Sequence, residues 1–219
     1  MGRIDALVPT GIVACESTQA VPIETLLPEE RAVVAHAVRG RAAEFAAGRW
    51  CARTALSRLG IPECPLLPGA GRAPAWPDGI VGSITHTAGF CAAAVGRRHE
   101  YAGIGIDAEA LTRVVPELWS HLFLPDEIDA LRRLPARQRE CTAAVFFSAK
   151  ESFYKAQYAI TGAWLGFKDA LVDVNGDTWA LRIVRPVSVL SHIREPFIGR
   201  YELRETYVFT AIAIRAIAG

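Results

Sequence analysis

Two long stretches of the chain combine apolar residues at helical spacing with recognisable start and stop signals. In residues 41–59 the apolar side chains fall near one face of a helix, and Gly60 supplies a C-terminal stop. A second and longer helical stretch covers residues 137–160. Each is preceded by a proline followed by acidic residues, which suit the first turn of a helix, at Pro28-Glu29-Glu30 and at Pro125-Asp126-Glu127. The pattern therefore predicts the same helical order twice.

Strand-like segments accompany both helical regions. They cover residues 5–20 (a strand and a loop), 81–85, 90–95 (a strand or a buried segment), 101–106, 169–175, 179–187 and 200–217. Asn175-Gly176 predicts a hairpin between two of them. Each half of the chain thus has strands and one long helix, which predicts an α+β fold of two similar halves, residues 1–105 and 106–219. Identity between the halves is too low to define an internal repeat from the sequence alone.

Composition narrows the class of protein. Of the 219 residues, 51% are apolar and 21% are charged, as in soluble globular proteins. The net charge of +1 argues against nucleic acid or a membrane surface as the partner. No secretory signal or apolar run of ~20 residues occurs, so we expect a cytoplasmic protein. Five cysteines without a C-x-x-C pair predict buried thiols rather than disulfides or a zinc site.

The first candidate for chemistry is the segment Ile104-Gly105-Ile106-Asp107-Ala108-Glu109. Side chains alternate along a strand, so Asp107 and Glu109 project to the same side. Two adjacent carboxylates repel each other unless a cation lies between them. Oxygen ligands at a partly open site suit Mg²⁺. The alternative interpretation is a solvated carboxylate pair at the end of a strand.

The second candidate lies in the segment FFSAKESFYKA, residues 146–156. Glu151 and Lys155 are one helical turn apart and share a face. The aromatic residues around them indicate partial burial, and a partly buried carboxylate needs a counter-charge such as a metal. A lysine one turn later suits a phosphate. The alternative is a surface Glu–Lys pair that contributes little to stability.

Basic and hydroxyl residues suited to anions precede the acidic segment. Arg72 lies in the rigid loop GRAPAWP, which leads into Gly82-Ser83-Ile84-Thr85-His86. Backbone N–H groups and small hydroxyl residues at a turn can hold an anion, and a histidine can add a hydrogen bond. Arg49 and Arg53 share a helix face, and Arg41 lies on the same helical stretch; an anion would offset their repulsion. The alternatives are a structural histidine and separately solvated arginines.

Five segments, in this order, resemble the 4′-phosphopantetheinyl transferases. They are GRWCAR, GRAPAWP, GSITHTAGF, GIGIDAE and FSAKESFYKA. Among the members of that family, the enterobactin synthase component D subgroup of the surfactin-type class is the most similar. The resemblance runs from Arg41 to Phe167, and GIDAE followed by FSAKESFYKA is its most specific part. Thr87 departs from the cysteine that this subgroup often has after its Thr-His pair.

The resemblance implies a set of site residues. Asp107, Glu109 and Glu151 would bind Mg²⁺, with Mn²⁺ as an alternative ion, and Lys155 would contact the transferring phosphate. The coenzyme A contacts implied by position are Arg41, Arg49, Arg53, Arg72, Ser83, Thr85, His86 and Lys155. Glu151 and Glu127 are the candidates for accepting a proton. Residues 1–105 would form the nucleotide-binding side, and residues 106–219 would carry the metal site and dock the carrier protein.

The activity that the resemblance implies is transfer of 4′-phosphopantetheine from coenzyme A to a serine of an apo acyl or peptidyl carrier protein, with release of adenosine 3′,5′-bisphosphate. The family's surfactin type is a pseudo-twofold monomer, and the subgroup favours siderophore, nonribosomal-peptide or polyketide synthesis. Two alternatives use the same residues: a metal-dependent hydrolase of nucleotide pyrophosphates and a non-catalytic coenzyme A-binding module. The sequence does not identify the carrier protein or the tolerance for acylated coenzyme A.

Overall fold

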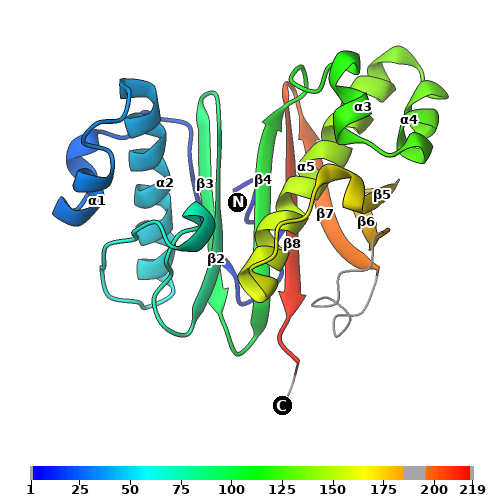
Figure 1. The fold of residues 1–219 in the computed structure, drawn as a ribbon. Helices are drawn as coiled ribbons and strands as arrows, with labels where there is room; N and C mark the ends of the chain where they lie inside the picture. The colour runs from blue at the N-terminus through cyan, green and yellow to red at the C-terminus, as the bar shows by residue number, and fades with distance from the viewer. Residues whose placement is uncertain (1, 185–195, 218–219) are drawn as a thin grey trace.

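The computed structural model describes residues 2–184 and 196–217 and contains two antiparallel sheets, each with a long helix packed against it (Figure 1). The elements of the first half are β1 (Val13–Ser17), α1 (Pro28–Val33), α2 (Arg39–Arg58), β2 (Ile80–Thr87) and β3 (Phe90–Arg97). Those of the second half are β4 (Tyr101–Ala110), α3 (Trp119–Leu122), α4 (Pro125–Arg132), α5 (Ala136–Thr161), β5 (Ala170–Asn175), β6 (Thr178–Ile183), β7 (Phe197–Arg204) and β8 (Tyr207–Arg215). Single turns of 3₁₀ helix lie at Ile23–Thr25, Ala70–Arg72, Pro116–Leu118 and Phe167–Asp169.

The strand order is β1-β3-β2 in the smaller sheet and β4-β8-β7-β6-β5 in the larger one, with antiparallel pairing throughout. This confirms the predicted α+β class. The single strand predicted over residues 200–217 is wrong, because β7 and β8 form a hairpin there. Its turn places Glu205 at φ +43°, a conformation that usually requires glycine or asparagine, so the sequence carried no turn signal. Residues 185–187 of the predicted strand 179–187 lie outside the described residues.

The two halves repeat one plan. Glu30 in α1 and Glu127 in α4 each accept the backbone N–H of the residue three positions earlier, at 3.1 and 2.8 Å. Each carboxylate also pairs with a buried base on the following long helix, Arg53 on α2 and Lys150 on α5. The two glutamates are 97 positions apart in the sequence, and so are the two bases. Equivalent polar contacts therefore reveal a relation between the halves that residue identity did not.

The predicted division after residue 105 falls inside β4. That strand is continuous from Tyr101 to Ala110 and pairs with β8. We propose instead that the halves meet between β3 and β4. The two sheets lie side by side at β2 and β4 (Figure 1). The hydroxyls of Ser83 and Thr85 on β2 accept backbone N–H groups of β4, from Ile106 and Ala108, each at 3.1 Å.

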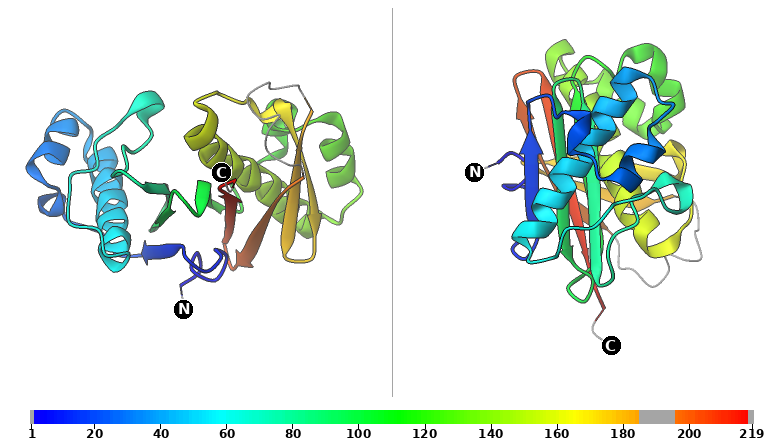
Figure 2. Two further views of the ribbon diagram at one scale, coloured as in Figure 1. Left: turned by 90° about the horizontal axis from the view of Figure 1, so that it is seen from below. Right: turned by 90° about the vertical axis from the view of Figure 1, so that its left-hand side faces the viewer.

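Alternation along β4 separates a purely structural face from a polar one. Ile104 and Ile106 pack with Ile4 and Leu7 of the N-terminal segment. That segment lies behind the sheets, away from the long helices (Figure 2). The intervening residues of β4 face α5, and among them are the two carboxylates of the strand. The apolar half of the alternating pattern thus anchors β4 and turns its polar half toward the helix.

Two glycines let α5 approach β4 unusually closely. A Cβ atom added at Gly105 would overlap the carbonyl oxygen of Ser152, and one at Gly103 would overlap that of Ala156. Both oxygens belong to the backbone of α5, so a side chain could not simply move aside. Glycine at these positions brings the helix backbone against the strand and sets the distance between the polar groups of the two elements.

Three of the cysteines, Cys15, Cys51 and Cys91, are buried, and all five are free thiols, as the sequence predicted. Within the part of the chain that the structure describes, no helix is both long and apolar enough to cross a lipid bilayer.

Replacing Gly105 with alanine should therefore destabilise the protein by about 1–3 kcal/mol or more, because the added methyl forces α5 away from β4. Thermal denaturation followed by circular dichroism measures the effect. Gly40→Ala is the matched control, since a Cβ at Gly40 on α2 meets nothing within 4 Å. Equal melting temperatures for Gly105→Ala and the wild type would contradict the role assigned to this glycine.

Candidate functional site

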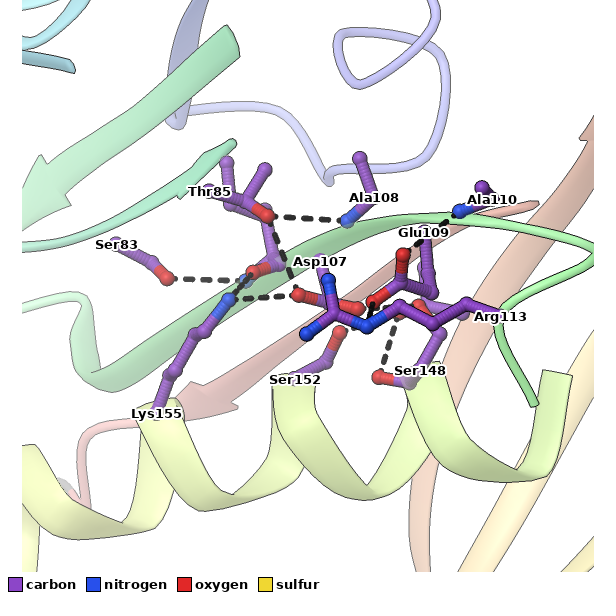
Figure 3. Close-up of polar contacts among 12 residues, drawn as sticks. Ser83, Thr85, Asp107, Ala108, Glu109, Ala110, Arg113, Ser148, Ser152 and Lys155 are labelled. Atoms are coloured by element: carbon purple, nitrogen blue, oxygen red, sulfur yellow. Dashed lines mark hydrogen bonds and ion pairs between the residues drawn. The ribbon is translucent and has the colours of Figure 1, made fainter. Parts of the chain in front are cut away.

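Asp107 is the centre of a polar cluster between β4 and α5 (Figure 3). The residue is only 6% exposed. Its Oδ1 atom accepts hydrogen bonds from Lys155 Nζ at 2.8 Å and from the Thr85 hydroxyl at 3.2 Å. Its Oδ2 atom accepts one from the Ser148 hydroxyl at 2.8 Å. A buried carboxylate is thus held from β2 and from two residues of α5 that lie about two helical turns apart.

Glu109 lies two residues further along β4 and faces the same side, as the alternation predicts. One carboxylate oxygen accepts the backbone N–H of Ala110 at 2.8 Å, and the other lies 3.4 Å from Nε of the exposed Arg113. Burial raises the pKa of Glu109, although Ala110 and Arg113 oppose the shift. The carboxylate is therefore incompletely compensated by the chain.

Glu151 joins the two strand carboxylates from α5. Burial raises its pKa, Lys155 lowers it, and the charges of Asp107 and Glu109 raise it further. Unlike the other two, it has no hydrogen-bond partner among the described residues. The three predicted carboxylates therefore lie near enough for their charges to affect one another. Glu151 is the one whose carboxylate makes no hydrogen bond to the described residues.

The donor set of these carboxylates fits a hard divalent cation. Three carboxylates supply oxygen ligands of the kind Mg²⁺ prefers, and burial disfavours the charge on two of them. Among residues 2–184 and 196–217, no three acidic, histidine or cysteine side chains are already gathered as a finished ligand set. Asp107 instead contacts Lys155, and Glu109 contacts Arg113. The positive charges of Lys155 and Arg113 thus offset part of the repulsion among the three carboxylates.

A cavity of about 550 Å³ adjoins the cluster. One wall is the Gly69–Trp76 loop, which includes Arg72, and the other is the face of α5 that carries Glu151 and Lys155. Aromatic side chains complete the lining: Trp76, Tyr154, Tyr158 and Trp164. The cavity therefore joins an apolar chamber to a charged end, as a ligand with an apolar arm and phosphates requires.

A second group of basic residues lies near the polar cluster, on the side of α2. Arg41 contacts the imidazole of His86 at 3.2 Å and Glu44 at 3.2 Å. Burial lowers the pKa of His86; the charge of Glu44 opposes this shift, while those of Arg41 and Lys155 add to it. The predicted anion-binding residues Arg41 and His86 are thus neighbours, and the field of Lys155 reaches them.

Arg49 and Arg53, predicted together as anion contacts, have different surroundings. Arg53 is buried in its ion pair with Glu30, so its interactions serve the fold. Arg49 donates from Nε to the Leu66 carbonyl at 2.6 Å, and burial lowers its pKa to about 10. Its terminal nitrogens have no hydrogen-bond partner among the described residues. The contacts of Arg53 are thus structural, whereas the terminal nitrogens of Arg49, which is also buried, keep hydrogen-bonding capacity.

The hydroxyls of Ser83 and Thr85 also have structural partners. Both are buried and accept the N–H groups of β4 described above. Ser83 lines the cavity, whereas Thr85 contacts Asp107 directly. These contacts join β2 to β4 at the boundary between the two sheets, which is called the seam below. The contact of Thr85 also orients the carboxylate of Asp107.

Glu127 does not join the carboxylate cluster. It is 2% exposed, and its Oε2 atom pairs with Lys150 Nζ at 2.7 Å. Oε1 accepts the backbone N–H of Val172 at 2.9 Å. A carboxylate with these partners cannot receive a proton from a substrate without breaking the buried pair. The predicted role of Glu127 as a proton acceptor is therefore not supported by the structure.

Sequence reasoning missed the groups that hold the cluster together, namely Ser148, Ser152, Thr210 and Arg113. A signal was present for the two serines. Ser148 and Ser152 are four residues apart on the predicted helix, interleaved with Glu151 and Lys155, so all four share one broad face. Thr210 had no such signal, because its proximity depends on the pairing of β8 with β4.

Two family models match the chain. The model of the 4′-phosphopantetheinyl transferase N-terminal domain matches residues 29–96, and that of the 4′-phosphopantetheinyl transferase superfamily matches residues 103–203. The chain is 46% identical to 4′-phosphopantetheinyl transferase Svp of Streptomyces mobaraensis, over 90% of this chain and 82% of the relative.

Similarity extends to further characterised proteins. The chain is 38% identical to 4′-phosphopantetheinyl transferase PptT of Mycobacterium tuberculosis, over 87% of this chain and 86% of the relative. It is 32% identical to enterobactin synthase component D of Escherichia coli strain K12, over 80% of this chain and 78% of the relative.

Replacing Glu127 with glutamine tests its structural assignment. The change leaves Lys150 buried without a counter-charge, so unfolding should become easier by about 3–5 kcal/mol. Turnover per folded molecule, measured below the melting transition, should stay within a few-fold of the wild type. A loss of turnover without a loss of thermal stability would instead make Glu127 part of the reaction.

Proposed function

Because the chain belongs to the 4′-phosphopantetheinyl transferase superfamily, we propose that its cavity binds coenzyme A and that Asp107, Glu109 and Glu151 hold a divalent cation beside it. As a member of this family, the protein is an enzyme that transfers phosphopantetheine to carrier proteins. The observation that supports the proposed site is the junction of the cavity with the cluster. Glu151 and Lys155 line the cavity, and Lys155 also bonds to Asp107.

The cation would neutralise charge that develops on the pyrophosphate oxygens during transfer. Mg²⁺ is the ion proposed, since the donor set consists of carboxylate oxygens, and Mn²⁺ is a chemical substitute for it. Lys155 holds its ammonium group at the same end of the cavity through Asp107 and the Ile106 carbonyl, at 2.8 and 3.0 Å. It adds a positive charge beside the phosphate that is attacked.

Glu151 is the proposed proton acceptor. It lines the cavity, its carboxylate has no hydrogen-bond partner among the described residues, and burial raises its pKa. The carrier serine oxygen forms a bond to the phosphorus next to the pantetheine arm, and its proton passes to Glu151. The phosphorus–oxygen bond to the adenosine bisphosphate breaks, and that group leaves with the electron pair.

Coenzyme A would lie with its pantetheine arm against the aromatic lining and its nucleotide phosphates toward the basic residues. Arg72 flanks the cavity, while Arg41 and His86 form a pair near Lys155. Guanidinium groups suit forked contact with phosphate oxygens. Similarity to enterobactin synthase component D favours carrier proteins of siderophore synthesis, with nonribosomal-peptide and polyketide carriers as the related class.

The test is intact-mass spectrometry of an apo carrier protein incubated with coenzyme A, Mg²⁺ and the enzyme. We expect a gain of one phosphopantetheine unit. Asp107→Asn and Glu151→Gln should each lower the rate by about 100-fold or more, because charge compensation at the phosphate is lost. Near-normal rates for either variant at saturating Mg²⁺ would overturn the assigned site.

The same assay separates two other functions. A hydrolase of nucleotide pyrophosphates would release adenosine bisphosphate from coenzyme A without any carrier protein. A non-catalytic coenzyme A-binding module would bind coenzyme A equally well after metal removal and add no mass to the carrier.

Arg72→Ala should raise the KM for coenzyme A by about 10-fold, since a charge-assisted hydrogen bond to phosphate is lost, with a smaller change in kcat. Steady-state kinetics at varied coenzyme A provides the measurement. Arg182→Ala is the matched control, because Arg182 is an exposed arginine on β6 paired with Asp173. Equal KM values for both variants would remove Arg72 from the binding site.

A further inference from the structure

A buried chain of hydroxyl groups continues behind Asp107. Ser148, Ser152 and Thr210 are all fully buried, and the Thr210 hydroxyl contacts both serine hydroxyls. Thr210 lies opposite Asp107 on the neighbouring strand β8. Three buried hydroxyls in contact with one another are costly unless every hydrogen has an acceptor.

The hydrogens of these groups can be assigned from their partners. A carboxylate only accepts, so the Ser148 hydroxyl donates to Asp107. The Thr210 hydroxyl donates to the backbone carbonyl of Ser148 at 2.9 Å, which leaves its oxygen to accept from Ser152. The order of donation therefore runs from Ser152 through Thr210 to the backbone of Ser148, whose side chain bonds to Asp107.

The first half of the chain offers an internal control. Cys15 pairs with Ala93 across β1 and β3, as Asp107 pairs with Thr210 across β4 and β8. Ala93 and Thr210 each lie three residues after the first residue of their strand, which is Phe90 in β3 and Tyr207 in β8. Each of these strands also forms a hairpin with the strand before it. Strand positions can therefore be compared one by one.

The helices confirm this alignment. Arg58 on α2 donates to the carbonyl of Ala14 at 3.0 Å, and Lys155 on α5 donates to the carbonyl of Ile106 at 3.0 Å. Both carbonyls belong to the residue just before the compared strand position, Cys15 or Asp107. Arg58 and Lys155 are related by the same separation of 97 positions as the two buried ion pairs.

Every member of the hydroxyl network is replaced at once in the first half. The counterparts of Asp107, Ser148, Ser152 and Thr210 are, in that order, Cys15, Cys51, Ala55 and Ala93. These cysteines and alanines are buried as well, so a strand and a helix pack in the same way without hydroxyls. The fold itself does not require the network, which belongs to the half that carries Asp107, Glu109 and Glu151.

We propose that Ser148, Ser152 and Thr210 are positioning residues that fix the Asp107 carboxylate for its divalent cation. Thr210 holds the backbone of Ser148 and the side chain of Ser152, and Ser148 holds one oxygen of Asp107. This inference rests on the proposed function, in which Asp107 is a cation ligand. Groups that orient a ligand from behind commonly change metal affinity by about 10- to 100-fold when they are removed.

The test is a titration of the protein with Mn²⁺ in the absence of coenzyme A. The free ion is measured by electron paramagnetic resonance, at a temperature where circular dichroism shows that each variant is folded. Thr210→Val removes the hydroxyl at nearly constant volume, and Ser148→Ala removes the direct bond to Asp107. Each should raise the Mn²⁺ dissociation constant by about 10-fold or more. Thr210→Ser retains the hydroxyl and should bind within about 2-fold of the wild type.

Cys51→Ser is the matched control, since it places the hydroxyl of Ser148 at the equivalent position of the half that lacks carboxylates. It should leave Mn²⁺ affinity unchanged. Wild-type affinity in both Ser148→Ala and Thr210→Val would overturn the inference, whatever happens to their melting temperatures. If Thr210→Val fails to fold, Ser148→Ala decides, because alanine is well accommodated in a helix.

Failure of the cation site itself gives a different result. Mn²⁺ would then bind equally to the wild type and to Asp107→Asn, or to neither. That outcome overturns the site and the inference together, whereas loss of binding in Asp107→Asn with wild-type affinity in the hydroxyl variants overturns the inference alone.

Discussion

The close contact between α5 and β4 is the constraint on which the rest of the site depends. Gly103 and Gly105 remove the side chains that would separate the helix backbone from the strand. At this separation the ammonium group of Lys155 reaches both Asp107 and the Ile106 carbonyl. The charge repulsion among the carboxylates is then offset by nearby cations, while apolar packing on the opposite face of β4 keeps the strand in place.

Charged residues divide into those that hold the fold and those that face the cavity. Arg53 and Lys150 are buried beside Glu30 and Glu127. Removing one partner of either pair would leave the other charge buried without a counter-charge. Lys155 and Arg72, by contrast, line the cavity with part of their charge open to a ligand. Residue type does not distinguish these groups; burial and the number of fixed partners do.

The repeated plan of the two halves makes their chemical difference informative. Both halves preserve the buried ion pair and the long helix packed on a sheet, so these features belong to stability. The cluster of Asp107, Glu109 and Glu151 belongs to the second half, and β2 of the first half contributes the Thr85 hydroxyl to Asp107. The reactive cluster is thus a property of the seam between the halves as well as of the second half.

The sequence by itself determined the fold class, the long helices and the acidic residues, because period-two and helical spacing follow directly from local backbone geometry. It also placed Glu151 and Lys155 on one helix face. Tertiary structure alone decided which charged groups are free: Glu127 and Arg53 resemble site residues in sequence, yet each is held in a buried ion pair. The contacts of Thr85 and Ser148 with Asp107 also join distant segments. Helical spacing placed Ser148 on the same face as Glu151 and Lys155, but it could not show that this face meets β4.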